Sequence, residues 1–222
     1  ERILDDGARA NLNAVFFQVR GNGDAFYEPG REPWAQRLAG RLGQDPGWDP
    51  LLEMLDRAHA RGIQIHAWLN TFPAWSGTTA PADSMPPHPL RAHPEWLCAD
   101  QNGAPMPPST EEYQFFSPGN PEVREHIASV VEDLVTRYAL DGVHFDYVRY
   151  PGPTFCHDAA SNRDLATAQA MDPSLSRGDW QRSRITAMLE DVRARVMRVR
   201  PSTAISAANW GIYRNVWGWS AV

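Results

Sequence analysis

Cysteine is scarce in this chain of 222 residues, which has only Cys98 and Cys156. No cysteine pair stands at the spacing of a zinc site, and no HxH or HExxH motif is present, so the signatures of a metal hydrolase are missing. Both cysteines lie in segments of loop-like composition. The sequence leaves open one disulfide or two free thiols, and it slightly favours free thiols.

Long apolar runs and basic runs are also missing. The longest hydrophobic stretches have the length of a β-strand, so we expect no membrane-spanning segment in this chain. The net charge is -6, with acidic and basic residues interspersed, which argues against nucleic acid or an anionic membrane as the partner. The composition, 42% hydrophobic and 22% charged, is ordinary for a globular protein.

Tryptophan, in contrast, is abundant, with 9 residues beside 19 prolines and 16 glycines. Most of the tryptophans lie in or beside predicted loops: Trp34, Trp48, Trp75, Trp96, Trp180, Trp217 and Trp219. A loop tryptophan either covers the core or offers a flat surface on which a sugar ring stacks. Composition alone favours the core.

Hydrophobic periodicity predicts helices and strands in alternation. The predicted helices cover 2–11, 50–61, 121–139 and 179–200, and the predicted strands lie in 13–20, 63–72, 141–151 and 203–209. Asp49 and Asn120 are predicted to cap two of the helices, each followed by proline in the first turn. Such alternation predicts a parallel sheet with right-handed crossovers.

The connections between these elements are asymmetric. Helix-to-strand links have only a few residues, whereas the strand-to-helix segments are long loops: Gly21–Pro46, Pro73–Asn120 and Pro151–Gly178. In Pro73–Asn120 the sequence predicts no helix. All long loops therefore fall at the carboxyl ends of the strands, where a (β/α)8 barrel builds its site.

Only four strands are predicted, while a closed barrel needs eight. We therefore interpret residues 1–222 as one catalytic domain that is an interior part of an α/β, (β/α)8 TIM-like barrel. On this interpretation the first strand and the last strands lie outside the chain. The alternative is a complete, small doubly wound domain.

One carboxylate stands within an apolar and aromatic stretch, Asp146 in 142–148. Strand periodicity puts His144 and Asp146 on one face, with Phe145 and Tyr147 on the other. Because a buried carboxylate is costly unless it is paired or solvated, we place Asp146 at the carboxyl end of the strand. Further residues of this strand and of the three other predicted strands complete the predicted site: Gln18, Arg20, His66, Trp68, Asn70, His144, Arg149, Tyr150 and Asn209.

Several of these residues have another explanation. Arg149 fits an ion pair with Asp146, and Gln18 fits a polar layer inside a barrel. Asp24 fits a turn best, although it is also the best candidate in this chain for a second carboxylate. Because no G-x-S-x-G elbow or G-x-x-x-x-G-K-[ST] loop is present, we expect carboxylate chemistry without a cofactor or metal, as in glycoside hydrolysis.

Several segments carry a family resemblance along nearly the whole chain: 13–20, 22–27, 32–34, 49–51, 61–70, 93–97, 118–124, 141–146 and 211–215. With these segments the chain resembles the glycosyl-hydrolase-like TIM-barrel family that includes glycosidases of denuded peptidoglycan. The resemblance implies a barrel related to the α-amylase type, with a catalytic aspartate at the end of the fourth strand. That position is Asp146, and Asp24 and Arg214 join the expected substrate-binding residues. Ser117 departs from the acidic or amide residue expected there.

We therefore expect a glycoside hydrolase in which Asp146 acts as nucleophile or as charge stabiliser, with Arg149 and His144 tuning its ionisation. The expected substrate is a polysaccharide or oligosaccharide, with an amino-sugar glycan such as peptidoglycan as one candidate. The resemblance implies a bacterial protein that is secreted or lies in the cell envelope. The alternatives are a non-catalytic carbohydrate-binding barrel and a purely structural α/β domain.

Overall fold

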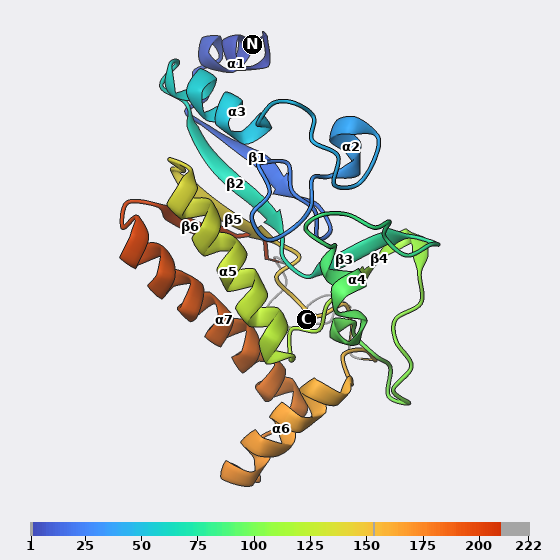
Figure 1. Cartoon of the computed structure of the whole chain (residues 1–222). Coiled ribbons are helices and arrows are strands. Elements are labelled where there is room, and N and C mark those ends of the chain that lie inside the picture. The colour runs from blue at the N-terminus through green and yellow to red at the C-terminus, as the bar shows by residue number, and fades with distance from the viewer. Residues whose placement is uncertain (1, 153, 210–222) are drawn as a thin grey trace, which may run out of the picture.

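The computed structural model describes residues 2–152 and 154–209 (Figure 1). The helices are α1 (Arg2–Arg9), α2 (Gln36–Ala39), α3 (Pro50–His59), α4 (Pro89–Ala92), the 3-10 helix η1 (Pro94–Trp96), α5 (Pro121–Arg137), α6 (Ala159–Met171) and α7 (Arg177–Val199). The strands are β1 (Ala14–Arg20), β2 (Gln64–Asn70), β3 (Pro73–Gly77), β4 (Ser109–Phe115), β5 (Gly142–Asp146) and β6 (Ala204–Ala207).

Four strands form one parallel sheet in the order β1-β2-β5-β6, and β3 and β4 form a separate antiparallel pair. In the parallel sheet Val15 pairs with Ile65, and Val143 pairs with both Ala67 and Ile205. Each crossover carries the chain one strand further in the same direction. Because a doubly wound sheet reverses direction at a switch point, this order is that of a (β/α)8 barrel.

The helices cover one face of this sheet. On that face Ile65, Leu69, Val143 and Phe145 are fully buried, whereas Phe16 on the opposite face is 50% exposed. An arc of a barrel requires such one-sided cover, because its other face lines the barrel interior. Over the part of the chain that is described, the arc is open, with β1 and β6 as its edges.

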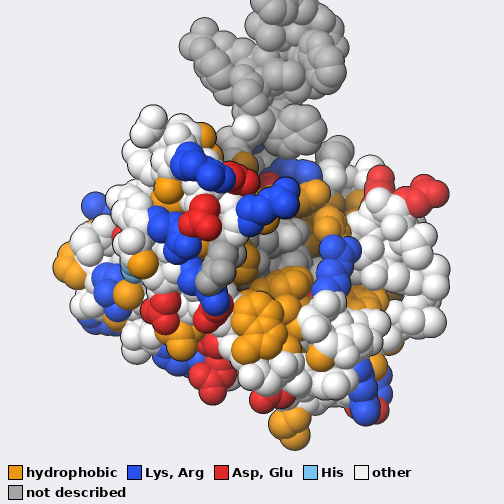
Figure 2. All heavy atoms as spheres, turned by 90° about the horizontal axis from the view of Figure 1, so that it is seen from above, with side chains coloured by type: hydrophobic (Ala, Val, Ile, Leu, Met, Phe, Trp, Pro, Cys, Tyr) orange, Lys and Arg blue, Asp and Glu red, His pale blue; other side chains and the backbone are white. Residues whose placement is uncertain are grey.

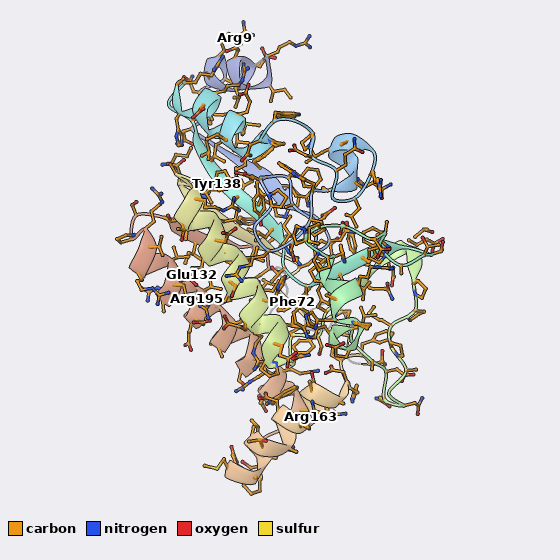
Figure 3. All side chains as sticks on the ribbon, viewed as in Figure 1. Arg9, Phe72, Glu132, Tyr138, Arg163 and Arg195 are labelled. Carbon is orange, nitrogen blue, oxygen red and sulfur yellow. A yellow bond between two sulfur atoms is a disulfide. The ribbon has the colours of Figure 1, made fainter. Side chains whose placement is uncertain are left out.

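Helices α5 and α7 lie side by side against the sheet (Figure 1). Glu132 on α5 and Arg195 on α7 point toward each other and form a salt bridge of 3.2 Å (Figure 3). Beneath them, the apolar side chains of Val131 and Val192 are fully buried. The packing thus follows the apolar stripes that the sequence predicts for both helices.

The two predicted helix caps, Asp49 and Asn120, are confirmed. The carboxylate of Asp49 accepts hydrogen bonds from the backbone N–H groups of Leu51 and Leu52, at 2.9 and 3.1 Å. The side chain of Asn120 accepts one from Glu122 N at 2.9 Å. In both helices a proline follows the cap, where its missing N–H leaves no intrahelical bond unmade.

Two predicted loops contain regular structure. The segment 73–120, predicted to have no helix, holds β3, β4, α4 and η1, and the segment 151–178 holds the 13 residues of α6. Helix α7 also begins at Arg177, slightly earlier than predicted. The reason α6 escaped prediction is its weak apolar stripe, since Ser161 and Leu165 are its buried residues.

The expectation of free thiols is wrong, because Cys98 and Cys156 form a disulfide. Both residues are fully buried, and the two loops that carry them run alongside each other. His157 N donates a hydrogen bond to Ala99 O at 2.9 Å, next to the disulfide. The bond therefore joins two long loops on the carboxyl-end side of the sheet, a proximity that spacing in the sequence does not reveal.

The surface combines apolar and charged groups. On the face seen in Figure 2, apolar side chains gather in a patch bordered by basic and acidic ones. Within residues 2–152 and 154–209, every helix is too short or too polar to cross a bilayer.

Candidate functional site

The carboxyl ends of β2 and β5 bring an amide and a carboxylate together. Asn70 and Asp146 are direct partners in the parallel register, as the last residues of their strands. Neighbouring strands lie about 4.8 Å apart, and both residues belong to the face opposite the helices. Asn70 is buried and Asp146 is partly buried. The structure therefore places the predicted catalytic carboxylate beside a predicted binding residue.

The peptide unit that follows Asp146 is held from both sides. Thr71 donates two hydrogen bonds to the carbonyl oxygen of Asp146, one from its backbone N–H and one from Oγ1, each 2.8 Å long. Tyr147 N donates to Oδ1 of Asp146 at 2.7 Å. Tyr147 has a φ of 50°, a value that is uncommon for a residue with a side chain. The carboxylate at the end of β5 is thus oriented by its own backbone.

Deeper on the same face lies a group of rings. Phe16 contacts His66 and His144, with ring centroids 5.1 and 4.7 Å apart. Nδ1 of His144 lies 2.9 Å from Oγ of Ser206. Burial lowers the pKa of His144, and the negative charge of Asp146 opposes this effect without cancelling it. His144 is therefore mostly uncharged at neutral pH.

Four of the predicted site residues have a buried polar atom with no hydrogen-bond partner among the residues described. The atoms are His66 Nδ1, Trp68 Nε1, Asn70 Oδ1 and the hydroxyl of Tyr150. Most buried polar groups in proteins are paired, and leaving one unpaired costs about 1–3 kcal/mol. Of these atoms, Asn70 Oδ1 lies beside Asp146, whereas His66 lies opposite Gly142 at the start of β5, and the charged groups that act on Tyr150 are Arg124, Asp158, Arg184 and Asp164. An unpaired buried acceptor next to a carboxylate is typical of a site that makes its hydrogen bonds to a polar ligand.

An aromatic cluster, Tyr113, Phe115 and Tyr147, stands beside the carboxylate. The ring of Tyr147 lies 5.5 Å from that of Tyr113 and 6.1 Å from that of Phe115. The guanidinium of Arg149 lies 5.0 Å from the Tyr147 ring centre and 6.0 Å from that of Phe115. Arg149 thus lies over the aromatic cluster that follows Asp146. The sequence had placed Arg149 in the predicted site with Asp146.

Sequence reasoning missed this cluster. Tyr113 and Phe115 come from β4, which was predicted to be a loop, and Tyr147 was assigned to the opposite face of a longer strand. The strand ends at Asp146, so the alternation that placed Tyr147 does not apply. The signal in the sequence that could have revealed this cluster is Tyr147, an aromatic residue directly after the carboxylate Asp146.

The structure gives Arg20 a different environment from the one predicted. Its side chain is fully buried, and it pairs with Glu32 through two hydrogen bonds of 2.8 Å. Its Nη1 also donates to the backbone oxygens of Asn70 and Thr71. Arg20 therefore contacts the end of β2 rather than the open face of the sheet.

Asp24 lies in the turn that follows β1. Its Oδ1 accepts a hydrogen bond from Asn22 N at 3.1 Å, and the residue is buried. Desolvation raises the pKa of this carboxyl, although the backbone hydrogen bond from Asn22 opposes the rise. The pKa of Tyr113 is raised by its own burial first, then by Tyr147, and further by Asp24 and Asp146. Both carboxylates therefore act on one phenol.

The remaining predicted residues have varied surroundings. Gln18 is partly buried on β1, Asn209 is exposed after β6, and Arg214 lies outside the described residues. Ser117 is buried, and its hydroxyl lies 2.8 Å from that of Ser161. Among the tryptophans, Trp34, Trp96 and Trp180 are core residues and Trp48 is exposed, while Trp217 and Trp219 also lie outside the described part.

Residues 2–152 and 154–209 contain no group of three or more His, Cys, Asp or Glu residues arranged to hold a metal ion. On the face opposite the helices, the ends of β2 and β5 carry the amide of Asn70 and the carboxylate of Asp146, and the imidazoles of His66 and His144 lie deeper. This arrangement suits recognition of a neutral, hydroxyl-rich ligand next to a fixed negative charge.

The fold and the position of the carboxylate define a class, the TIM-barrel proteins of the glycoside hydrolase type. The chain belongs to the family described as Glycosyl hydrolase-like 10, whose model matches residues 1–219. It is 29% identical over 218 residues to glycosyl hydrolase YngK of Bacillus subtilis (strain 168), covering 96% of this chain and 40% of that protein. It is 32% identical over 225 residues to glycosyl hydrolase DigH of Escherichia coli (strain K12), covering 96% and 47%.

The chain therefore spans less than half the length of both relatives. Among solved structures, the α-L-fucosidase isoenzyme 2 of Paenibacillus thiaminolyticus superposes with a TM-score of 0.66 at 15% identity, covering 95% of this chain and 29% of that one. This likeness confirms the partial barrel.

Proposed function

We propose that this chain carries the catalytic carboxylate of a glycoside hydrolase that cleaves a polysaccharide or oligosaccharide. The observation that supports this most directly is the position of Asp146. It stands at the carboxyl end of β5, beside Asn70, whose buried Oδ1 has no partner among the residues described. A sugar supplies the hydroxyl groups that such atoms bind.

In the proposed reaction Asp146 is ionised and acts as nucleophile, or as charge stabiliser, for an oxocarbenium-like transition state. The N–H of Tyr147 donates to Oδ1 and fixes the orientation of the carboxylate. Asn70 beside Asp146, and Trp68 and His66 deeper on the same face, bind sugar hydroxyls through buried atoms that have no partner among the described residues. Tyr113 provides a ring face close to Asp146 for contact with the apolar face of a sugar.

Glycoside hydrolysis needs a second carboxyl group, and Asp24 is the candidate within this chain. Its burial raises the pKa of the carboxyl, which favours the protonated form that a general acid requires. Asp24 and Asp146 both raise the pKa of Tyr113, so both carboxylates act on the same side chain. The competing assignment puts the acid in the part of the relatives that this chain does not span.

For the substrate we propose an amino-sugar glycan, with peptide-free peptidoglycan strands as the first one to test, and a bacterial cell-wall context. We also propose that the protein works outside the cytosol, in the envelope or secreted. The buried disulfide between Cys98 and Cys156 supports an oxidising compartment, because such bonds are rare where thiols are kept reduced.

The test is the substitution Asp146→Asn in the full-length protein, assayed for release of reducing ends from peptide-free peptidoglycan, chitin and a neutral glucan. We expect cleavage to fall by on the order of 10³-fold or more, because a nucleophilic or charge-stabilising carboxylate is lost, while glycan binding is kept. Asp141→Asn is the matched control, since Asp141 lies near the other end of β5 and bonds to Ile65 N.

Three outcomes are decisive. Loss of cleavage in Asp146→Asn with normal cleavage in Asp141→Asn supports the proposal. Unchanged cleavage in Asp146→Asn removes Asp146 from the reaction. Glycan binding by the unaltered protein with no cleavage of any tested glycan would assign the non-catalytic carbohydrate-binding barrel instead.

A further inference from the structure

A single peptide unit links three residues at the ends of β2 and β5. Its carbonyl oxygen belongs to Asp146 and accepts both hydrogen bonds from Thr71, each 2.8 Å long. Its N–H belongs to Tyr147 and donates to Oδ1 of Asp146 at 2.7 Å. Because a trans peptide is planar, its C=O and N–H point in opposite directions. Fixing the oxygen with two bonds therefore also fixes the direction of the N–H.

The conformation of Tyr147 needs this external support. A φ of 50° is unfavourable for a residue with a Cβ, and such residues persist when their surroundings hold them. The ring of Tyr147 is packed edge-on against Tyr113 and lies below Arg149. Thr71 holds the other end of the same peptide. The two anchors together keep the N–H directed at the carboxylate.

Thr71 is itself held in place by the buried ion pair. Nη1 of Arg20 donates to the backbone oxygen of Thr71 at 3.0 Å, and Arg20 is fixed by Glu32. Thr71 has no exposed surface, so it does not reach a substrate. The contacts thus run from the end of β1 through Thr71 to the carboxylate at the end of β5.

We propose that Thr71 is a positioning residue, which sets the orientation of the Asp146 carboxylate through the 146–147 peptide unit. This inference rests on the proposed function for its catalytic consequence, but its geometric part stands on hydrogen bonds alone. It also gives Arg20 a role in the site without contact to the substrate. His144 on β5 and Tyr113 on β4 also interact electrostatically with Asp146, and the test leaves both unchanged.

The test compares Thr71→Val, which removes the hydroxyl at nearly constant shape, with Thr71→Ser, which keeps it. In the full-length protein we expect Thr71→Val to lower kcat on the order of 10- to 100-fold with little change in KM, because misplacing a reacting group costs rate rather than binding. Thr71→Ser should restore kcat.

A second measurement does not depend on activity. The amide proton of Tyr147, followed by NMR, should shift upfield in Thr71→Val, because its hydrogen bond to the carboxylate weakens, and should keep its position in Thr71→Ser. An unchanged Tyr147 amide in Thr71→Val overturns the inference. So does a loss of kcat that Thr71→Ser shares, or a loss of kcat/KM that comes from a rise in KM alone.

The two proposals fail in different ways. If Asp146→Asn retains cleavage, the proposed function is wrong, whatever Thr71 does. If Asp146→Asn abolishes cleavage and Thr71→Val matches the unaltered protein in kcat and in the Tyr147 amide shift, the positioning role alone is wrong.

Discussion

Arg20 and Glu32 form an ion pair in which neither side chain has any exposed surface. His126 adds a third group, with Nε2 2.9 Å from Oε1 of Glu32. Burial alone would raise the pKa of the Glu32 carboxyl, but Arg20 and His126 outweigh that effect and lower the pKa well below its ordinary value. The pair joins the end of β1 to the segment before α2 and to α5.

Breaking this pair should therefore be costly. Glu32→Gln leaves the charge of Arg20 buried without its counter-ion, and we expect the free energy of unfolding to fall by about 3–5 kcal/mol. Urea titration monitored by circular dichroism measures the change. Glu53→Gln is the control, since it removes a partly exposed partner of Arg57 on α3, a pair worth less than about 0.5 kcal/mol. Equal losses in the two variants would contradict a special role for the buried pair.

Gly142 is required by the close approach of His66. A Cβ at position 142 would overlap Nδ1 of His66, so we expect Gly142→Ala to destabilise the fold by about 1–3 kcal/mol and to displace the imidazole. Gly152→Ala is the control, because apart from its chain neighbours no atom of the described residues lies within 4 Å of its added Cβ. Thermal unfolding measures the stability of both variants. Adding His66→Ala to Gly142→Ala should recover part of the lost stability, because the overlapping imidazole is gone. No relief in the double variant would refute the contact as the cause.

Much of the fold was predictable because its signals are local. The strand β5 is a β-branched and aromatic run between a turn and a carboxylate, and the starts of α3 and α5 carry a capping residue followed by proline. Asp146 stood out for the same reason, as a charge within an apolar stretch. The face that carries His66, Asn70 and Asp146 followed from strand periodicity.

The parts that sequence reasoning missed depend on contacts between distant segments. The burial of Arg20 depends on Glu32, which the chain brings back from a loop of no regular pattern. The disulfide depends on two loops whose sequence separation is 58 residues. Tyr113 reaches the site from β4, in a segment whose prolines suggested an irregular loop. Tyr147 was misplaced because the strand was predicted to run through 141–151 but ends at Asp146, where the positive φ of Tyr147 breaks the alternation.

The disulfide should contribute substantially to stability. By the loop-closure relation, a bond between Cys98 and Cys156, which are 58 residues apart, stabilises the fold by about 4 kcal/mol through the unfolded state. Reduction should lower the free energy of unfolding by about 2–5 kcal/mol, measured by urea titration with and without a reductant. The double variant Cys98→Ala, Cys156→Ala should have about the same free energy of unfolding as the reduced protein, and adding the reductant should not change it. Full stability after verified reduction would refute this expectation.

Stability should also depend on pH through His88. Burial lowers the pKa of this imidazole from 6.5 to about 4, and both of its nitrogens are used, with Asn22 O 2.9 Å from Nε2 and Leu90 N 3.2 Å from Nδ1. The unfolded chain takes up a proton near pH 6.5, whereas the folded chain does so only near pH 4. Stability is therefore lost as pH falls through this window, by about 2 kcal/mol between pH 7 and pH 5.

The measurement is the free energy of unfolding at pH 7 and pH 5, for the unaltered protein and for His88→Gln, which keeps a donor for Asn22. Because other groups also titrate, the comparison uses the difference between the two proteins. The variant should lose about 2 kcal/mol less over this range. Identical losses would show that His88 is not the group responsible.

Two asparagines with equal burial should respond in opposite ways to the same substitution. Asn70 and Asn120 are each 2% exposed, but Oδ1 of Asn70 has no partner among the residues described, while Oδ1 of Asn120 caps α5. Asn70→Ala removes an unpaired acceptor, so stability should change by less than about 1 kcal/mol, yet glycan cleavage should fall about 10²-fold because a group beside Asp146 is lost. Asn120→Ala should cost about 1 kcal/mol and leave cleavage intact.

Thermal unfolding and kcat/KM, measured together for both variants, decide between a role of Asn70 in the fold and one in the site. If cleavage in Asn70→Ala falls only in proportion to lost stability, Asn70 serves the fold and not the substrate.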